Sequence, residues 1–245
     1  MPGNVTRASA ALLALGALAY TAWVLEVLVE TGLDPVRTYV SELAAADQPL
    51  GGLFRATDLV AGVLVLAGAV TGLVGTGRHG TGRRASGGGA EGAGAARGPR
   101  EPWAIVGWIA LAVFGAATAV DSRLPLSCAP TVDPECAARE TAGLVPATHT
   151  AHAVSSGLAM TGALVALVAL TVAARRHGRR PLARIGPVLV ALELAATVWT
   201  LAAVAAFEAG KGIWALGAGQ RLQVLLVAVW LAVLAYSLAT AEEER

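Results

Sequence analysis

The chain has little charge: Asp, Glu, Lys and Arg together make up 14% of its 245 residues, and Lys211 is the single lysine. Soluble globular domains average about 25% charged residues, so this composition argues against that class. The arginines are divided among short segments and form no continuous basic face, so we expect no nucleic-acid partner. Arginine in place of lysine, with abundant alanine and glycine, indicates a high-GC bacterial genome.

Cysteines and catalytic motifs are also scarce. Cys128 and Cys136 are the two cysteines of the chain. They are too few for a zinc ribbon and too far apart for a CxxC redox pair. The sequence contains neither the HExxH motif of zinc proteases nor the GxSxG turn of serine hydrolases. A local disulfide between Cys128 and Cys136 is the better prediction, provided that their loop lies outside the cell.

Apolar residues, by contrast, make up 56% of the chain and gather in six long runs. A helix needs about 20 apolar residues to cross roughly 30 Å of hydrocarbon. The first run could also be a signal peptide, but it is longer than the usual ~7–15-residue apolar region and contains Glu26. The sequence therefore predicts an all-α fold, a polytopic six-span transmembrane helical bundle in one domain over residues 1–245. The predicted spans are 8–29, 58–75, 103–120, 149–174, 185–207 and 219–240.

The segments between the runs predict the orientation of the bundle. Residues 77–101 are rich in Gly and Arg and read as a flexible linker, whereas residues 121–148 form a Pro-rich loop that holds both cysteines. Of the 18 Lys and Arg residues, twelve fall on the side of the N-terminus and six on the other. Positive residues favour the cytoplasmic side. We therefore expect cytoplasmic termini, a cytoplasmic linker, an extracytoplasmic disulfide loop and residence in a bacterial plasma membrane.

Polar groups gather at the predicted outer ends of the spans. Charges near hydrocarbon are costly unless they are paired, solvated or turned toward the bundle interior, so such a gathering predicts a functional site. The alternative is purely structural pairing of these charges at the membrane surface. The ligand-binding candidates are Glu26, Glu42, Arg55, Asp58, Asp121, His149, His152, Ser156 and Arg221.

Three of these residues suggest a more specific chemistry. His149 and His152 lie three residues apart on one helix, and Asp121 could add a carboxylate, which would give a divalent metal site with a free position for water. These residues are the catalytic and metal candidates for hydrolysis at the outer leaflet. Serine nucleophile chemistry at Ser155 or Ser156 has less support. Glu193, deep in the fifth span, could relay a proton or simply bond to a neighbouring hydroxyl group.

Three stretches resemble a bacterial family of six-span membrane proteins catalogued as domain of unknown function 998. They are RTYVSELAAADQP, DSRLPLSCAPTVDPECAARETAG with the following HTAH and SS, and GAGQR before the last span. More distantly, the chain resembles seven-span hydrolases that bind zinc through His and Asp, although its span count and histidine spacing differ. The resemblance implies the fold and topology, but no activity. The positions that carry it are Ser41, Glu42, Arg55, Asp58, Asp121, Cys128, Cys136, His149, His152 and Arg221.

Three hypotheses of function follow. The leading one is binding or transport of a small amphipathic or lipid-like molecule in an outward-facing polar pocket. The second is a metal-assisted membrane hydrolase that uses Asp121, His149 and His152. The third is a membrane scaffold without chemistry. All three hypotheses expect the lipid bilayer as a partner.

Overall fold

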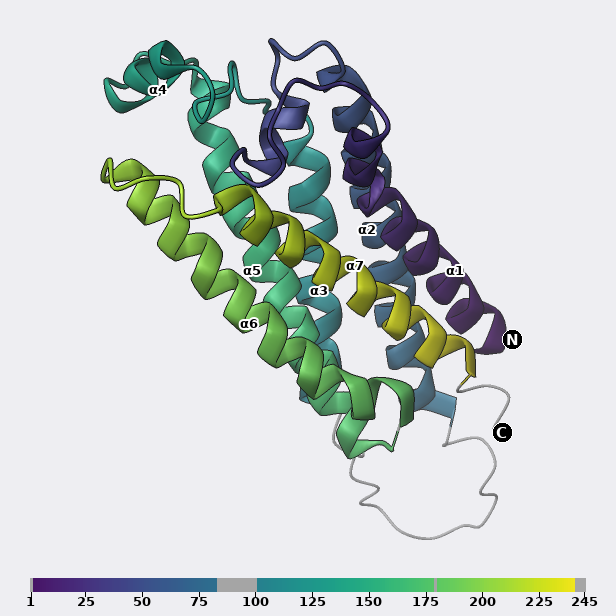
Figure 1. Ribbon diagram of the computed structural model, residues 1–245. Coiled ribbons are helices and arrows are strands. Elements are labelled where there is room, and N and C mark those ends of the chain that lie inside the picture. Colours follow the sequence, from purple (N-terminus) through teal and green to yellow (C-terminus); the bar gives the residue numbers. More distant parts are fainter. Residues whose placement is uncertain (1, 83–100, 179, 241–245) are drawn as a thin grey trace, which may run out of the picture.

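The computed structural model describes residues 2–82, 101–178 and 180–240, and this part of the chain contains helices and no strands. Six of its segments are long and apolar enough to cross a membrane. The predicted all-α fold with six candidate spans is therefore confirmed (Figure 1). The spans are α1 (Pro2–Tyr20) continued by the 3-10 helix η1 (Ala22–Val27), α2 (Gly51–Gly82), α3 (Pro102–Asp121), α5 (Ala147–Arg176), α6 (Arg180–Glu208) and α7 (Leu216–Thr240).

The six spans form a closed ring. Each packs against two neighbours, in the order α1, α2, α3, α5, α6, α7 and back to α1. The inside of the ring is filled by large apolar side chains, among them Phe114, Leu167 and Trp230, which are at most 1% exposed. Such a bundle satisfies its backbone hydrogen bonds within each helix, as a membrane requires.

Small residues allow the helices to approach closely. A Cβ atom added at Gly62 of α2 would lie 2.5 Å from the backbone nitrogen of Ala119, and one at Gly115 of α3 would lie 2.5 Å from that of Leu66. Both distances are far below a van der Waals contact. Membrane helices often associate through small residues in this way, because lipid supplies no hydrophobic force between them.

The outward surfaces of the spans are apolar. Leu18 is 70% exposed and Val198 is 67% exposed, and both lie within spans. A soluble protein would not keep such side chains in water along several helices. The exposed apolar surface supports a lipid bilayer as the environment of the bundle.

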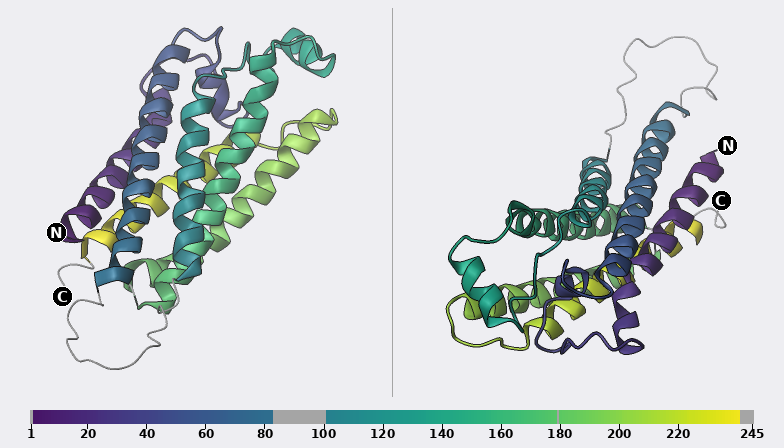
Figure 2. Two further views of the ribbon diagram at one scale, coloured as in Figure 1. Left: turned by 180° about the vertical axis from the view of Figure 1, so that it is seen from behind. Right: turned by 90° about the horizontal axis from the view of Figure 1, so that it is seen from above.

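The two ends of the bundle differ. Pro2 and Thr240, the first and last described residues of the outermost helices in the sequence, lie at one end of the bundle, and the right panel of Figure 2 gives a view onto the other end, called here the loop end. The loop end carries the first loop (residues 28–50, with η2, Val40–Ala44), the disulfide loop (residues 122–146, with α4, Pro134–Thr141) and the turn 209–215. The assignment of the loop end to the outside of the cell stays a prediction.

Several helices extend beyond the predicted spans: α1 begins at Pro2 instead of residue 8, and α6 at Arg180 instead of residue 185. The first two spans differ most. Regular α-helix ends at Tyr20, where the Thr21 hydroxyl donates to the Leu18 carbonyl, and the chain tightens into η1. Serine and threonine that bond back in this way often bend helices. Helix α2 begins at Gly51 instead of residue 58 and continues through residue 82. Most of the predicted linker, residues 83–100, lies outside the described residues.

Candidate functional site

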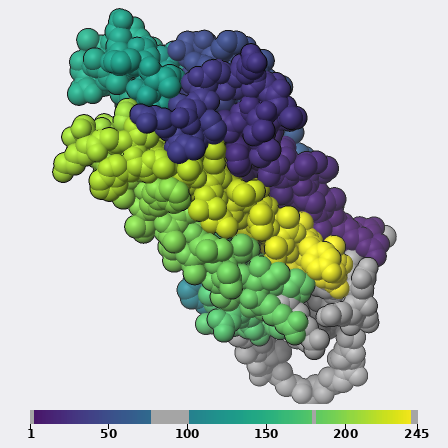
Figure 3. All heavy atoms as spheres, in the orientation of Figure 1, coloured from purple at the N-terminus to yellow at the C-terminus, as the bar shows by residue number. Residues whose placement is uncertain are grey.

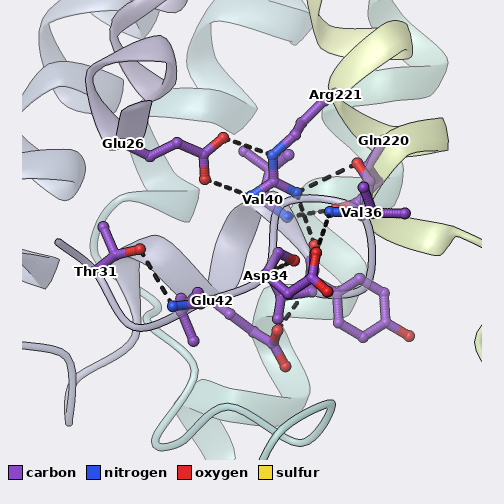
Figure 4. Close-up of polar contacts among 12 residues, drawn as sticks. Glu26, Thr31, Asp34, Val36, Val40, Glu42, Gln220 and Arg221 are labelled. Atoms are coloured by element: carbon purple, nitrogen blue, oxygen red, sulfur yellow. Dashed lines mark hydrogen bonds and ion pairs between the residues drawn. The ribbon is translucent and has the colours of Figure 1, made fainter. Parts of the chain in front are cut away.

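A buried ion pair ties α1's extension to α7. Nε and Nη2 of Arg221 donate to the two carboxylate oxygens of Glu26, and each donor–acceptor distance is 2.6 Å (Figure 4). The remaining nitrogen, Nη1, donates to the carbonyls of Thr38 at 2.8 Å and Gly217 at 3.3 Å. Glu26 is 9% and Arg221 7% exposed. Bidentate geometry, with further acceptors for the third guanidinium nitrogen, is what makes a buried pair tolerable.

The same end of α7 holds the backbone of the first loop. Oε1 of Gln220 accepts the N–H of Val40 at 2.8 Å, and the N–H of Ala218 donates to the Val36 carbonyl. At Gly217 an added Cβ would lie 2.4 Å from the Thr38 carbonyl oxygen, so only glycine lets the loop sit this close. The first loop is therefore folded down onto the bundle.

Glu42 joins the first loop to the disulfide loop. Its side chain is fully buried and accepts the backbone N–H of Tyr39 at 3.0 Å and that of Thr131 at 2.8 Å, together with the Thr131 hydroxyl. Burial raises the pKa of the Glu42 carboxyl, although these hydrogen bonds and the charge of Arg221 oppose the shift. A second link is the N–H of Ala46, which donates to the Leu126 carbonyl at 2.8 Å.

Arg55 of α2 supports the same junction from the side. Its Nη1 donates to the carbonyl of Ala44 at 2.6 Å and to that of Ala45 at 3.2 Å. Ala44 is the last residue of η2 and Ala45 is its C-cap, so these carbonyls lie where helical hydrogen bonds run out; the Ala45 carbonyl also accepts the N–H of Gln48 at 3.2 Å. In the space-filling view the first loop (dark purple to blue) and the disulfide loop (teal) lie together over the loop end (Figure 3).

The disulfide loop is closed as predicted. Cys128 and Cys136 are bonded, and both are at most 5% exposed. Asp133 caps α4 between them by accepting the N–H of Glu135 at 2.9 Å. The bridge keeps the Thr131 segment compact, so that Thr131 can reach Glu42.

Asp121, at the end of α3, meets the start of α5. Its Oδ1 lies 3.1 Å from Nδ1 of His152, and its Oδ2 accepts the Ser156 hydroxyl at 3.0 Å. The Ser155 hydroxyl also donates to Oδ1. Nδ1 of His152 faces a second acceptor, the Leu124 carbonyl at 3.0 Å, so this nitrogen carries the proton, and Nε2 faces the Ser156 hydroxyl at 3.2 Å. Asp121 thus has three side-chain partners.

His149 belongs to a different set of contacts. Its Nδ1 accepts the N–H of Ser127 at 3.1 Å, and its Nε2 lies 3.3 Å from Glu140. The structure therefore brings Asp121 to His152 but turns His149 toward the disulfide loop. Within the described ranges, no group of three or more His, Cys, Asp or Glu side chains could hold a metal ion. The arrangement gives the predicted metal set no geometric support.

A cavity of about 130 Å³ lies beneath the first loop, between α1, α2, α3, α5 and α7. One part of its wall is polar. Among the residues that line it are the carboxylates of Asp58 and Asp121, the hydroxyls of Ser41, Thr57, Thr118 and Ser156, and the amides of Gln220 and Gln223.

The rest of the wall is aromatic and apolar. Tyr20, Trp23 and Phe54 contribute rings, and Met160 a thioether. Tyr20 packs edge-on against Phe114, with 5.3 Å between the ring centroids, so the cavity joins the core of the bundle. Nε1 of Trp23 is buried and finds no acceptor among the residues described. A wall of this mixed character fits a molecule with a polar head and an apolar body.

The family model described as "Protein of unknown function (DUF998)" matches residues 13–90 and 89–237. The chain belongs to the DUF998 family. No curated protein and no solved structure gave a match. The resemblance seen in the first loop, the disulfide loop and the start of the last span is thereby confirmed, and this member is a membrane protein with six apolar helices.

The candidate residues of this DUF998 protein fall into three groups. Asp58, Asp121 and Ser156 line the cavity. The residues of a second group bind the loops that cover the cavity. The third group is the two histidines, which do not line the cavity: His152 contacts two lining residues, whereas His149 contacts none of them. The loop-holding group comprises Glu26, Glu42, Arg55 and Arg221.

Several lining residues were missed by sequence reasoning. Tyr20 and Trp23 of the first span were not among the candidates, yet the structure places them on the cavity wall. Gln220 and Gln223 carried a usable signal, because two amides three residues apart in an apolar span face the same side of a helix. Glu193 does not bond to Thr197, whose hydroxyl accepts from Gln223, and its own oxygens lack partners in the described part of the chain.

Proposed function

We propose that this DUF998 protein binds a small amphipathic or lipid-like molecule in the loop-end cavity, as a binding protein or transporter of the bacterial plasma membrane. The observation that carries the proposal is the cavity itself, which combines two carboxylates with three aromatic rings. The loop end faces outward in this proposal, in line with the excess of arginine on the side of the termini.

The structure of the cover supports a binding role. The first loop closes the cavity through Val40, Ser41 and Leu43, and it is held by specific contacts from α7, α2 and the disulfide loop. Loops of this length in a compact fold are usually functional. A scaffold would have no need of a polar cavity beneath its loop. The hydrolase hypothesis loses its support because His149 is turned away from Asp121.

Filling the cavity tests the proposal. The probes are three six-carbon amphiphiles, n-hexanol, n-hexylammonium and n-hexanoate, titrated into protein in lipid nanodiscs and followed by intrinsic tryptophan fluorescence. Ala159→Phe and Ser41→Trp each place a large ring in the cavity from a different element, α5 or η2. Leu158→Phe is the matched control, because Leu158 is 52% exposed on the outer surface of α5.

The expected result is saturable binding of at least one probe that both filling variants abolish and the control retains. If every probe behaves identically in the wild type, the two filling variants and the control, the cavity is not a binding site and the proposal is wrong.

A further inference from the structure

The charged groups around the cavity are unevenly compensated. Among the described residues that line the cavity, two have side chains that carry a formal charge, and both are acids, Asp58 and Asp121. No Lys, Arg or His is among these lining residues. Asp121 is served by His152, Ser155 and Ser156. Asp58 has no hydrogen bond or ion pair with any residue that the structure describes.

The nearby cations are already occupied. The guanidinium of Arg221 is taken by Glu26 and two carbonyls, and that of Arg55 by the carbonyls after η2. Neither can turn to Asp58 without leaving a buried acceptor unpaired, which would destabilise the cover. Asp58 therefore lies beside the cavity without a described partner, whereas Glu26 and Glu42 each have several.

The rest of the wall discriminates among cations. Tyr20, Trp23 and Phe54 present aromatic surface, which attracts an organic cation through the ring quadrupole and packs against its alkyl part. An inorganic cation that enters without its water would instead need an almost complete shell of oxygen ligands. The aromatic side of the cavity cannot supply one. The cavity volume of about 130 Å³ further restricts the ligand to a head group of a few heavy atoms.

We propose that the ligand's head is an organic ammonium group, which donates to the open carboxylate of Asp58 and lies against the aromatic rings of the cavity. Asp121 of α3 and Ser156 of α5 offer further acceptors on the cavity wall. This inference rests on the proposed function and names the chemical class of its ligand. Two sources supply such a head: a soluble alkylamine, or the headgroup of an amine-bearing phospholipid.

The probes of equal chain length provide the test. Wild-type protein should bind n-hexylammonium roughly tenfold to hundredfold more tightly than n-hexanol, the range expected when a neutral hydrogen bond is exchanged for a charge-assisted one. n-Hexanoate should bind more weakly than the alcohol. Asp58→Asn, which keeps the shape and removes the charge, should bring the ammonium and alcohol affinities to within about twofold of each other.

Matched controls separate this effect from a general change of surface charge. Asp47→Asn is the same substitution on an exposed residue of the first loop and should leave the preference intact. Nanodiscs of phosphatidylcholine with and without phosphatidylethanolamine distinguish the two sources. If phosphatidylethanolamine competes with n-hexylammonium, the ligand is the lipid headgroup. If it does not compete, the ligand is a soluble amine.

The outcomes are distinguishable. If n-hexanol and n-hexylammonium bind with equal affinity, and the filling variants abolish both, the ammonium assignment is overturned while the cavity is still a binding site. Displacement of n-hexylammonium by NaCl, when the same concentration of choline chloride has no effect, would assign the site to an inorganic cation and also overturn it. Retention of the preference in Asp58→Asn would show that another group selects the charge.

Discussion

The Glu26–Arg221 pair holds the first loop over the cavity, and a double-mutant cycle measures how strongly. Arg221→Met and Glu26→Leu each leave one charge buried without its partner, whereas the double variant leaves none. Removal of one member of a buried pair costs about 3–5 kcal/mol, but replacement of both by apolar residues is often nearly neutral. The cycle therefore separates the attraction within the pair from the rest of the fold.

The geometry sets the expected size. Both single variants should lose about 3–4 kcal/mol of stability, because each strands a side chain that is at most 9% exposed. The double variant should lose about 2–3 kcal/mol, since the carbonyls of Thr38 and Gly217 still lose their donor. The coupling free energy is then about 4 kcal/mol.

The assay is unfolding in mixed micelles of increasing SDS fraction, followed by tryptophan fluorescence. The matched control is the exposed pair of Glu135 and Arg139 in α4, where the charges lie 4.0 Å apart and the coupling should stay below about 0.5 kcal/mol. Additive losses at Glu26 and Arg221, with no more coupling than in α4, would refute the role of the pair as a buried clamp.

Three shorter predictions concern the cover of the cavity. Cys128→Ser should lower stability by about 2–3 kcal/mol through the lost constraint on the unfolded chain, with membrane insertion intact; a variant that melts like the wild type would contradict this. Because the pKa of Glu42 is raised in the folded protein, its contribution to stability is full below the unfolded-state pKa of about 4.3 and fades as pH rises through the folded-state pKa. Glu42→Gln should therefore flatten the dependence of melting temperature on pH in that window, and an unchanged dependence would contradict this role of Glu42. Gly217→Ala should destabilise and loosen the first loop, as limited proteolysis would show, whereas Gly157→Ala, with nothing within 4 Å of the added atom, should not; equal effects would show that the close approach at Gly217 is unimportant.

Much of the architecture follows from quantities that one sequence contains. The six spans need only length and hydropathy, because a bilayer sets both. The disulfide needed only two cysteines close together in a loop with turn residues. The gathering of Glu26, Asp121 and Arg221 at one end followed from their positions within the spans, once the spans were placed in alternating directions.

The pairing of those groups was beyond sequence reasoning. Glu26 reaches Arg221 because the chain leaves the α-helix at Tyr20 and tightens into η1, a change of pitch that no apolar pattern records. His149 and His152 share one side of an ideal helix, yet His149 lies against Ser127 and His152 against Asp121. Their partners come from different parts of the disulfide loop and α3, whose placement depends on tertiary packing. The predicted metal site needed a convergence that helical spacing alone cannot supply.

The cavity also depended on tertiary structure. Tyr20 and Trp23 have the sequence context of interface aromatics, and the same residue types serve both roles. The 3-10 helix η1 places Trp23 on the cavity wall. Phe54 reaches the same wall because α2 begins at Gly51. Asp58 was predicted at the mouth of a span, but the early start of α2 places it within the helix and beside the cavity.

The reactivity of a single thiol in the cavity tests the central claim most directly. Cys128 and Cys136 are bonded to each other and are the only cysteines of the chain, so Ser156→Cys introduces the one free thiol. In lipid nanodiscs, this thiol should react about tenfold faster with a small cationic methanethiosulfonate than with an anionic one of equal size, because two carboxylates line the space. Leu158→Cys, two positions along on the outer surface, should react slowly with both reagents. Equal rates with the two reagents at Ser156→Cys, or a thiol there as unreactive as the one at Leu158→Cys, would contradict a water-accessible, cation-selective cavity at the loop end.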